Sequence, residues 1–192
     1  MSDLKYWVGF NRIQGIGRAR FSQLEGYFGD LEHAWKAGPA ELKAAGLDSK
    51  SIEAIVASRP QISPDAEMER LERYGIKALT WNDPDFPARL KEIYDVPPLL
   101  YIRGTITSED EWTIAVVGTR RATVYGREVT EHLVTDLVQN RITIISGLAR
   151  GIDSIAHRAA LDAGGRTIAV FACGLDTVYP PENVKLAQAI ME

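Results

Sequence analysis

Apolar side chains recur at helical spacing through the first sixty residues, and glycines mark the turns between short segments. Leucine, isoleucine, phenylalanine and tryptophan fall three or four positions apart, which is the period of a helix with one buried face. The pattern predicts helices at residues 2–11, 17–28, 30–37, 38–45 and 49–58. We therefore expect a small all-helical domain over residues 1–60.

The next stretch mixes one helix with two short apolar runs. Ser63-Pro64 opens a predicted helix that Gly75 ends, because proline suits a first helical turn and glycine a C-terminal cap. Strands are predicted at 76–81 and 99–103, and the segment NDPDFP at 82–87 between them is rich in turn residues. We assign residues 61–192 to one α/β domain, to whose sheet these strands can contribute.

Strands and helices alternate after residue 111. Continuous apolar or β-branched runs at 113–117, 143–145 and 166–171 predict buried parallel strands, and helices are predicted at 125–140, at 154–163 and from about 181. This alternation indicates a Rossmann-like parallel sheet with helices on both faces. Sheets of this kind have roughly five or six strands. The chain stops inside a helical pattern, so we expect a sheet that further chain would complete.

The net charge of −4 is unevenly distributed, which limits how the chain can meet an anion. Residues 112–192 hold 8 basic residues (Lys and Arg) and 8 acidic residues (Asp and Glu). Residues 1–111 hold 14 basic and 18 acidic residues, so the acidic excess lies in this first part. A protein of this balance does not coat nucleic acid by bulk charge, so any anion site is local. The longest apolar runs are far shorter than the roughly 20 residues of a membrane span, and the first residues lack a secretory pattern.

A single cysteine, Cys173, cannot form an internal disulfide and has no partners for a metal cluster. We expect a reducing, cytoplasmic location and no membrane. Since Cys173 follows a predicted strand and has no basic neighbour in the sequence, we interpret it as a small buried residue and not a nucleophile.

The first loop, VGTRRATVYG at 117–126, follows the first parallel strand, where α/β sheets place ligands. Gly118 lets the backbone come close, Thr119 offers a hydroxyl, and Arg120 and Arg121 offer guanidinium groups suited to phosphate. The N-terminus of the following helix adds unpaired amides. The alternative is a solvated loop with two surface arginines.

The second loop, SGLARGID at 146–153, follows the next strand and predicts an anion-binding nest built on Ser146, Gly147 and Gly151. Asp153 fits a helix N-cap equally well, and a cap needs no function. His157 lies one helical turn further on. An Asp–His pair is compatible with acid–base chemistry, but we favour a contact at the helix surface or cap.

The third loop, GLDTVYPPEN at 174–183, follows the last predicted strand. Asn183 and Lys185 are predicted to face the same groove as the other loops. Tyr179 either stacks on a base or packs against the edge of the sheet.

In the helical segment, the turn QGIG at 14–17, flanked by Arg12, Arg18 and Arg20, is similar to a helix-hairpin-helix turn. Such a turn either contacts a DNA phosphate or serves only packing and protein contacts.

Several catalytic patterns are missing. The sequence has no Walker A loop, no GxGxxG after a strand, no Cys/His metal spacing and no GxSxG elbow. These absences exclude ATPase, dinucleotide-dependent, zinc and hydrolase functions in their usual forms. We expect no cofactor, no metal and no catalytic residue.

The three loops, in this order and spacing, resemble the signature of the DprA/Smf family. The segments NDPDFP at 82–87 and PPLLYIRG at 97–104 are also similar to the stretch before that family's core, and residues 1–60 resemble its small SAM-like or helix-hairpin-helix-like domain. The resemblance implies an extended Rossmann fold that binds single-stranded DNA without reading bases.

The resemblance further implies a role in natural transformation, in which the protein protects incoming single strands, helps load the RecA recombinase and forms a homodimer when the full domain is present. It implies no enzymatic activity, and it makes Arg120 a phosphate contact. This agrees with the residues, because amides, glycines and arginines at strand ends recognise phosphates and not base sequence.

Two alternatives remain open. A nucleotide-processing enzyme of the related phosphoribohydrolase family would carry a GGxGT loop, whereas the nearest match here, GGRT at 164–167, precedes a strand. A protein-interaction module is the other.

Overall fold

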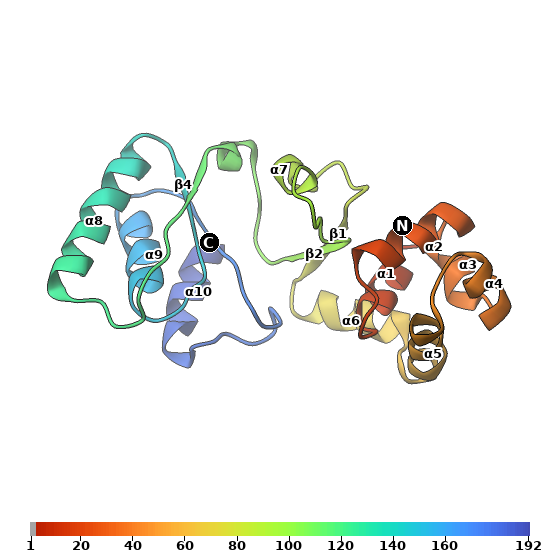
Figure 1. Ribbon diagram of the computed structural model, residues 1–192. Coiled ribbons are helices and arrows are strands. Elements are labelled where there is room, and N and C mark those ends of the chain that lie inside the picture. Colours follow the sequence, from red (N-terminus) through yellow and green to blue (C-terminus); the bar gives the residue numbers. More distant parts are fainter. Residues whose placement is uncertain (1–2) are drawn as a thin grey trace. The chain divides into compact units, whose positions relative to one another are not determined.

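The computed structural model describes residues 3–192. The chain divides into two compact units, Met1–Ile102 and Arg103–Glu192, and each is described by itself (Figure 1). The first predicted helix started at residue 2, which lies outside the described residues.

The first unit contains the five predicted helices, each within two residues of its predicted ends over the described positions. They are α1 (Leu4–Asn11), α2 (Arg18–Phe28), α3 (Leu31–Lys36), α4 (Pro39–Ala44) and α5 (Ser49–Ser58). Aromatic rings fill the core between them. Trp7 stacks on Phe21 with ring centroids 5.3 Å apart, and Phe10 meets Trp35 edge to face at 4.9 Å. Phe10 and Phe21 are fully buried, so the apolar period predicts this core correctly.

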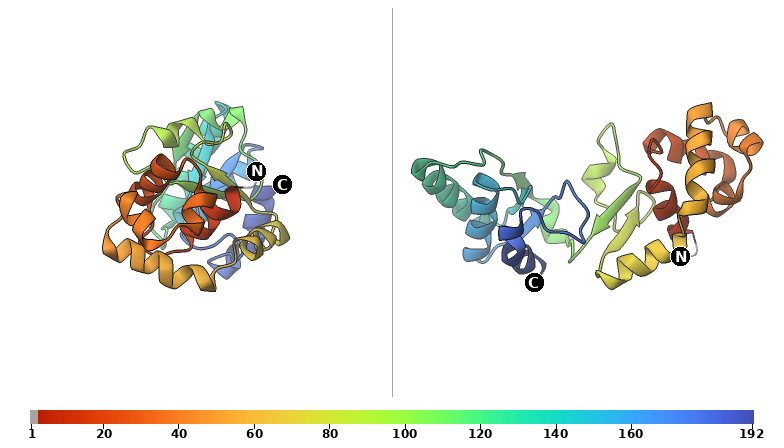
Figure 2. Two further views of the ribbon diagram at one scale, coloured as in Figure 1. Left: turned by 90° about the vertical axis from the view of Figure 1, so that its right-hand side faces the viewer. Right: turned by 90° about the horizontal axis from the view of Figure 1, so that it is seen from below.

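The same unit continues past residue 60 through η1 (Arg59–Gln61) and α6 (Pro64–Arg73) into an antiparallel hairpin of β1 (Lys77–Thr80) and β2 (Leu99–Ile102). Figure 2 shows α6 leading into this hairpin. A short helix, α7 (Ala88–Lys91), which the sequence pattern does not predict, lies in the connection between the two strands.

The hairpin belongs to the helical core and not to the parallel sheet, so the expectation that its strands join that sheet is wrong. Ala78 and Leu99 are buried in the same cluster as the helices, and Trp81 meets Trp7 edge to face at 5.6 Å. Because the hairpin is buried against the helices, the first compact unit extends to Ile102. The pattern of the sequence instead predicts a boundary after residue 60.

The second unit has the predicted α/β architecture. Its elements are η2 (Ser108–Glu111), β3 (Thr113–Ala115), α8 (Val124–Gln139), β4 (Thr143–Ser146), α9 (Ile152–Asp162), β5 (Thr167–Ala169), η3 (Pro181–Asn183) and α10 (Val184–Met191). The strands form a parallel sheet in the order β3-β4-β5. The α/β class and the parallel sheet are thus confirmed.

Helices α8 and α9 lie side by side in Figure 1, and both pack on one face of this sheet. Val134 of α8 and Ala156 of α9 are fully buried against Ile144 of β4. On the opposite face, Val117 and Val170 at the strand ends are 71% and 58% exposed. Helices α8 and α9 thus cover one face of the sheet, and α10 packs beside β5 and α9.

An ion pair between the partly exposed Arg166 and the buried Asp110 fixes the segment that leads into the sheet. Asp110 accepts hydrogen bonds from Nε and Nη2 of Arg166, each at 2.8 Å, and from the Thr143 hydroxyl at 3.0 Å. Burial raises the pKa of Asp110, but the bonds from Arg166 and from the Thr107 amide outweigh burial and hold it below its usual value. Asp110 is therefore ionised at neutral pH.

Candidate functional site

The three loops singled out in the sequence lie at one edge of the parallel sheet. The first loop follows β3, the second follows β4 and the third follows β5. Since the three strands are parallel and in register, their carboxyl ends meet at the same edge, where ligands bind in sheets of this kind.

Two glycines bring the first and second loops into direct contact. Gly151 has a φ of +78°, and a Cβ on it would collide with the carbonyl oxygen of Thr119 and lie 2.8 Å from the Cα of Arg120. A Cβ on Gly118 would lie 2.7 Å from Cγ1 of Ile152. The Ile152 amide donates to the Thr119 carbonyl at 3.1 Å. Gly118 thus makes room for the Ile152 side chain of the second loop, and its close approach to a ligand stays a prediction.

The first loop presents its arginines outward. The Thr119 hydroxyl accepts from the Arg121 amide at 3.1 Å, and the Thr123 hydroxyl caps α8 by accepting from the Gly126 amide at 3.1 Å. Arg120 and Arg121 are both exposed, and within residues 3–192 neither forms a salt bridge. Guanidinium groups and the free amides of a helix N-terminus are chemically suited to an anion.

The second loop is occupied by a carboxylate of the protein itself. Oδ2 of Asp153 accepts from the Gly147 amide at 3.1 Å and from the Ala149 amide at 3.4 Å. Ser146 is buried, and its hydroxyl donates to the Val116 carbonyl at 2.6 Å. Gly151 is the N-cap of α9, and Asp153 lies in its first turn. Asp153 therefore occupies the amides of Gly147 and Ala149, and of these two residues only Gly147 belongs to the predicted nest.

His157 is a buried histidine, so the expected contact at the helix surface is wrong. Its Nδ1 lies 2.6 Å from the hydroxyl of Thr167, which itself donates to the Ile144 carbonyl at 2.9 Å. A hydroxyl has one proton, so Nδ1 is the donor to Thr167 in this network. Burial lowers the pKa of His157 to about 4, although nearby Asp153 and the Ser146 backbone oppose that change. A neutral, fully buried imidazole supports the fold at neutral pH.

Asn183 and Lys185, the residues predicted to share a groove with the other loops, differ in their exposure to solvent. Asn183 is 1% exposed, and its Nδ2 donates to the Leu148 carbonyl at 2.9 Å and to the Ser154 hydroxyl at 2.8 Å. Lys185, two residues later on α10, is exposed. Asn183 therefore holds the second loop from inside, while only Lys185 is open to solvent.

Two further side chains of this region are exposed. Tyr179 is 64% exposed and does not pack on the sheet edge. Cys173 is exposed, which corrects the expectation of burial, because β5 ends at Ala169 and residue 173 lies in the connection beyond the strand. Its thiol donates to the Thr177 carbonyl at 3.4 Å.

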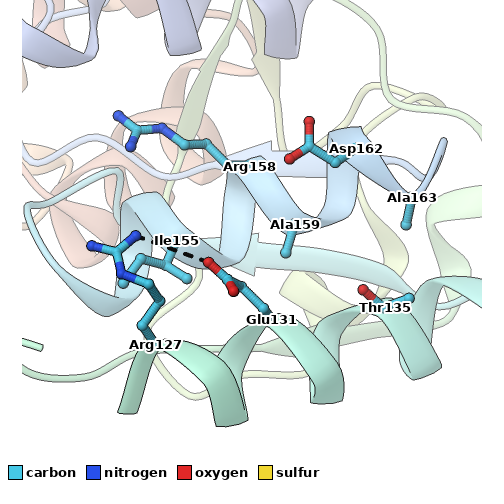
Figure 3. Close-up of a pocket in the computed structure, with 8 residues that line it drawn as sticks. All are labelled: Arg127, Glu131, Thr135, Ile155, Arg158, Ala159, Asp162 and Ala163. Carbon is cyan, nitrogen blue, oxygen red and sulfur yellow. Dashed lines mark ion pairs between the residues drawn. The ribbon is translucent and has the colours of Figure 1, made fainter. Parts of the chain in front are cut away.

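A groove of about 370 Å³ lies between α8 and α9 (Figure 3). Its charged lining consists of Arg127 and Glu131 on α8 and Arg158 and Asp162 on α9. Arg127 and Glu131 pair at 3.9 Å. Two arginines and two carboxylates cancel, so the groove offers an anion no net positive charge, and none of the predicted site residues line it.

The arginines around the N-terminal turn are engaged within the first unit. Arg20 hydrogen-bonds Ser51 at 3.0 Å and pairs with Asp48, Arg12 pairs with Glu67 at 3.4 Å, and Arg18 lies over the Tyr94 ring at 5.7 Å. All three arginines of this turn therefore have a partner within the first unit.

Within residues 3–192, no three His, Cys, Asp or Glu side chains come together to hold a metal ion. No helix among the same residues is long and apolar enough to cross a membrane.

The fold and the site define an α/β protein with a Rossmann-like parallel sheet, whose first strand-end loop presents two exposed arginines without a salt bridge among residues 3–192. The chain belongs to the DNA recombination-mediator protein A family, whose model matches residues 77–192. The resemblance noted from the three loops is thereby confirmed.

Among curated relatives, the chain is 38% identical to Protein Smf of Synechocystis over 98% of this chain and 49% of that protein. It is 34% identical to DNA processing protein DprA of Bacillus subtilis over 80% of this chain and 54% of that protein. The chain thus spans about half the length of the curated relatives it matches.

Two solved structures agree with the fold. The X-ray structure of DNA processing protein A from Streptococcus pneumoniae matches 97% of this chain and 64% of its own, with a TM-score of 0.75 and 30% identity. A structure of DNA processing protein A from Helicobacter pylori, solved to describe a single-stranded DNA binding mode, matches 61% of this chain and 52% of its own, with a TM-score of 0.53 and 34% identity.

Proposed function

We propose that this chain binds single-stranded DNA through the first loop, with Arg120 and Arg121 contacting backbone phosphates. The observation that carries the proposal is the exposure of these two guanidinium groups without an ion-pair partner among the described residues. The filled second loop concentrates the phosphate contacts on the first loop. Lys185 on α10 is a further exposed cation in the same unit.

Recognition of this kind does not depend on base sequence. Arginine forks and helix N-terminal amides bind phosphate oxygens, which are the same along every strand. Exposed tyrosines provide stacking surfaces for unpaired bases: Tyr125 is 75% exposed and Tyr179 is 64% exposed. Because the loops offer only a few cations, the salt dependence of binding is modest.

The relatives support a wider role, which we also propose. The family is described as DNA recombination-mediator protein A, and the structure of the Helicobacter pylori relative concerns single-stranded DNA. We infer that this protein acts in the cytoplasm during natural transformation, protects incoming strands and passes them to the RecA recombinase. Its action is binding and not catalysis, since His157 and Asp153 are buried and engaged.

Fluorescence anisotropy tests the binding proposal. A fluorescein-labelled oligothymidylate and a duplex of equal length are titrated with wild type, Arg120→Ala, Arg121→Ala and the control Arg158→Ala. The control removes one exposed arginine from the groove of Figure 3 and leaves the strand-end loops intact. We expect tighter binding of the single strand than of the duplex, a loss of about tenfold or more for Arg120→Ala, a smaller loss for Arg121→Ala and no loss for Arg158→Ala.

Equal affinities of Arg120→Ala and Arg158→Ala would contradict the proposed site. Absence of binding by folded wild-type protein would contradict the function.

Two further measurements test the wider role. RecA filament formation on strands coated with single-strand-binding protein is expected to accelerate when this chain is added, and an unchanged rate contradicts the hand-over. Sedimentation equilibrium tests the homodimer, for which a monomer at all concentrations is the contradicting result.

A further inference from the structure

Arg150, in the middle of the second loop, is held by an acidic residue that precedes α10. Its Nε and Nη2 both donate to the carboxylate of Glu182, the latter at 3.3 Å, so the pair is bidentate. The two side chains are 57% and 50% exposed. The hydrogen bond and charge of Glu182 raise the pKa of Arg150, and the bond from Arg150 lowers the pKa of Glu182. Both groups are therefore charged at neutral pH and open to solvent.

The backbone places Arg150 next to the proposed phosphate site. Its neighbour Gly151 lies against the backbone of Thr119 and Arg120 so closely that a Cβ would not fit. Arg150 is thus one residue away from the contact between the two loops. A single-stranded DNA that contacts Arg120 and runs along the edge of the sheet passes Arg150.

The chain fixes Glu182 in place through its neighbour. Asn183 is 1% exposed, and its two hydrogen bonds join it to Leu148 and Ser154 at the base of the second loop. A buried, fully bonded Asn183 leaves the residue before it little freedom. The exposed ion pair between Arg150 and Glu182 is accessible to a ligand that competes for Arg150.

We propose, building on the function proposed above, that Arg150 is a further phosphate-binding residue and that Glu182 is its competitor, which the DNA backbone must displace. A phosphate offers the Arg150 guanidinium the same bidentate geometry as the carboxylate it replaces. Exposed ion pairs of this kind are weak, so displacement is possible. Glu182 thereby lowers the affinity for single strands and makes binding depend less on salt.

The test is a double-mutant cycle measured by anisotropy with the labelled oligothymidylate, on the full 192-residue chain. The variants are Glu182→Gln, Arg150→Gln and the double variant. Asp162→Asn is the matched control, because it removes one exposed carboxylate at the far end of α9. Eleven residues of helix separate the two ends of α9, which corresponds to about 15 Å along its axis.

We expect Glu182→Gln to bind about three- to fivefold more tightly and Arg150→Gln to bind several-fold more weakly than wild type. The slope of log K against log salt is expected to steepen by about 0.7 in Glu182→Gln, since the variant lacks the displaced carboxylate, which takes up a counterion and offsets one released from the phosphate. In the Arg150→Gln background, the Glu182→Gln change is expected to have no effect. This dependence on Arg150 distinguishes competition from a general loss of negative charge.

Equal gains from Glu182→Gln with and without Arg150, or equal gains from Asp162→Asn, would overturn the proposal. Binding that Arg120→Ala abolishes but that neither Glu182→Gln nor Arg150→Gln alters would overturn the role of Arg150 and leave the proposed function intact. Failure of the folded wild type to bind any strand would overturn both. Circular dichroism and thermal melting establish that each variant is folded.

Discussion

The first and second loops both carry groups that can bind an anion. The structure leaves these groups exposed in the first loop and bonds the amides of the second loop to a carboxylate of the protein. Both follow a parallel strand, contain glycine and lead into a helix. In the second loop, Asp153 accepts the Gly147 and Ala149 amides, and Asn183 and Ser146 complete the bonding. In the first loop, Arg120 and Arg121 remain exposed. In a strand-end loop that carries its own carboxylate, the backbone amides serve the fold, and only exposed side chains remain to meet a ligand.

The largest expected effect comes from separating the two loops. Gly151→Ala places a methyl group on the Thr119 carbonyl in a left-handed conformation, so we expect a loss of unfolding free energy of about 3 kcal/mol or more, together with loss of DNA binding. Urea unfolding and anisotropy measure the two.

Gly164→Ala is the matched control for this prediction. Gly164 has a φ of +74°, but nothing lies within 4 Å of the position that a Cβ would take. Only the conformational cost of about 1 kcal/mol is expected there. Equal destabilisation by the two substitutions would show that the loops do not depend on this close approach.

A second prediction concerns acid sensitivity beneath the second loop. His157 has a pKa of about 4 in the folded protein and an ordinary value of 6.5, so the unfolded chain takes up a proton in a range where the folded chain does not. The stabilisation is complete above about pH 6.5 and falls as the pH decreases towards 4, by about 3 kcal/mol in total. Urea unfolding at pH 7 and pH 5 measures most of this loss.

His157→Gln is expected to flatten the stability profile between these two pH values, whatever its own stability at pH 7. The exposed His132 on α8 provides the control, because His132→Gln is expected to leave the profile unchanged. A wild-type profile that is flat from pH 7 to pH 5 would contradict a neutral buried imidazole.

The smallest expected effect lies at the start of α8, where the first loop meets its helix. Thr123→Ala removes the hydroxyl that accepts the Gly126 amide, so we expect a loss of about 1 kcal/mol in unfolding free energy. Thr123→Ser keeps the acceptor and is expected to retain most of the stability. If alanine and serine give the same stability, the cap is not what orders this end of the loop.

The sequence predicts most elements of the fold because their signals are local. The helical period over residues 17–58 and the buried strands of the second unit follow from spacing alone. The pairing of β1 with β2 does not follow from the sequence, because both segments are short and nothing in their composition distinguishes a hairpin from strands added to the parallel sheet. The burial predicted for Cys173 is wrong because the predicted strand before it extends two residues beyond the observed end of β5.

The site is only partly predictable because its decisive bonds join residues that are far apart in the chain. Asn183 and Leu148 are 35 positions apart, and Arg150 and Glu182 are 32 apart. Only Asp153 gives a local signal, since a carboxylate in the first turn after a glycine-rich loop can fold back onto the amides of that loop. Residue type identifies the candidates, and tertiary contacts determine which of them face solvent.

The most direct test of this division between the loops is a paired measurement of DNA affinity and unfolding free energy for Arg120→Ala and Asp153→Ala. We predict that Arg120→Ala lowers affinity for the oligothymidylate at least about tenfold and changes stability by less than about 0.5 kcal/mol. Asp153→Ala is predicted to lower stability by about 2 kcal/mol, because two amides of the second loop lose their acceptor. An Arg120→Ala variant that binds like wild type, or loses as much stability as Asp153→Ala, would contradict the account.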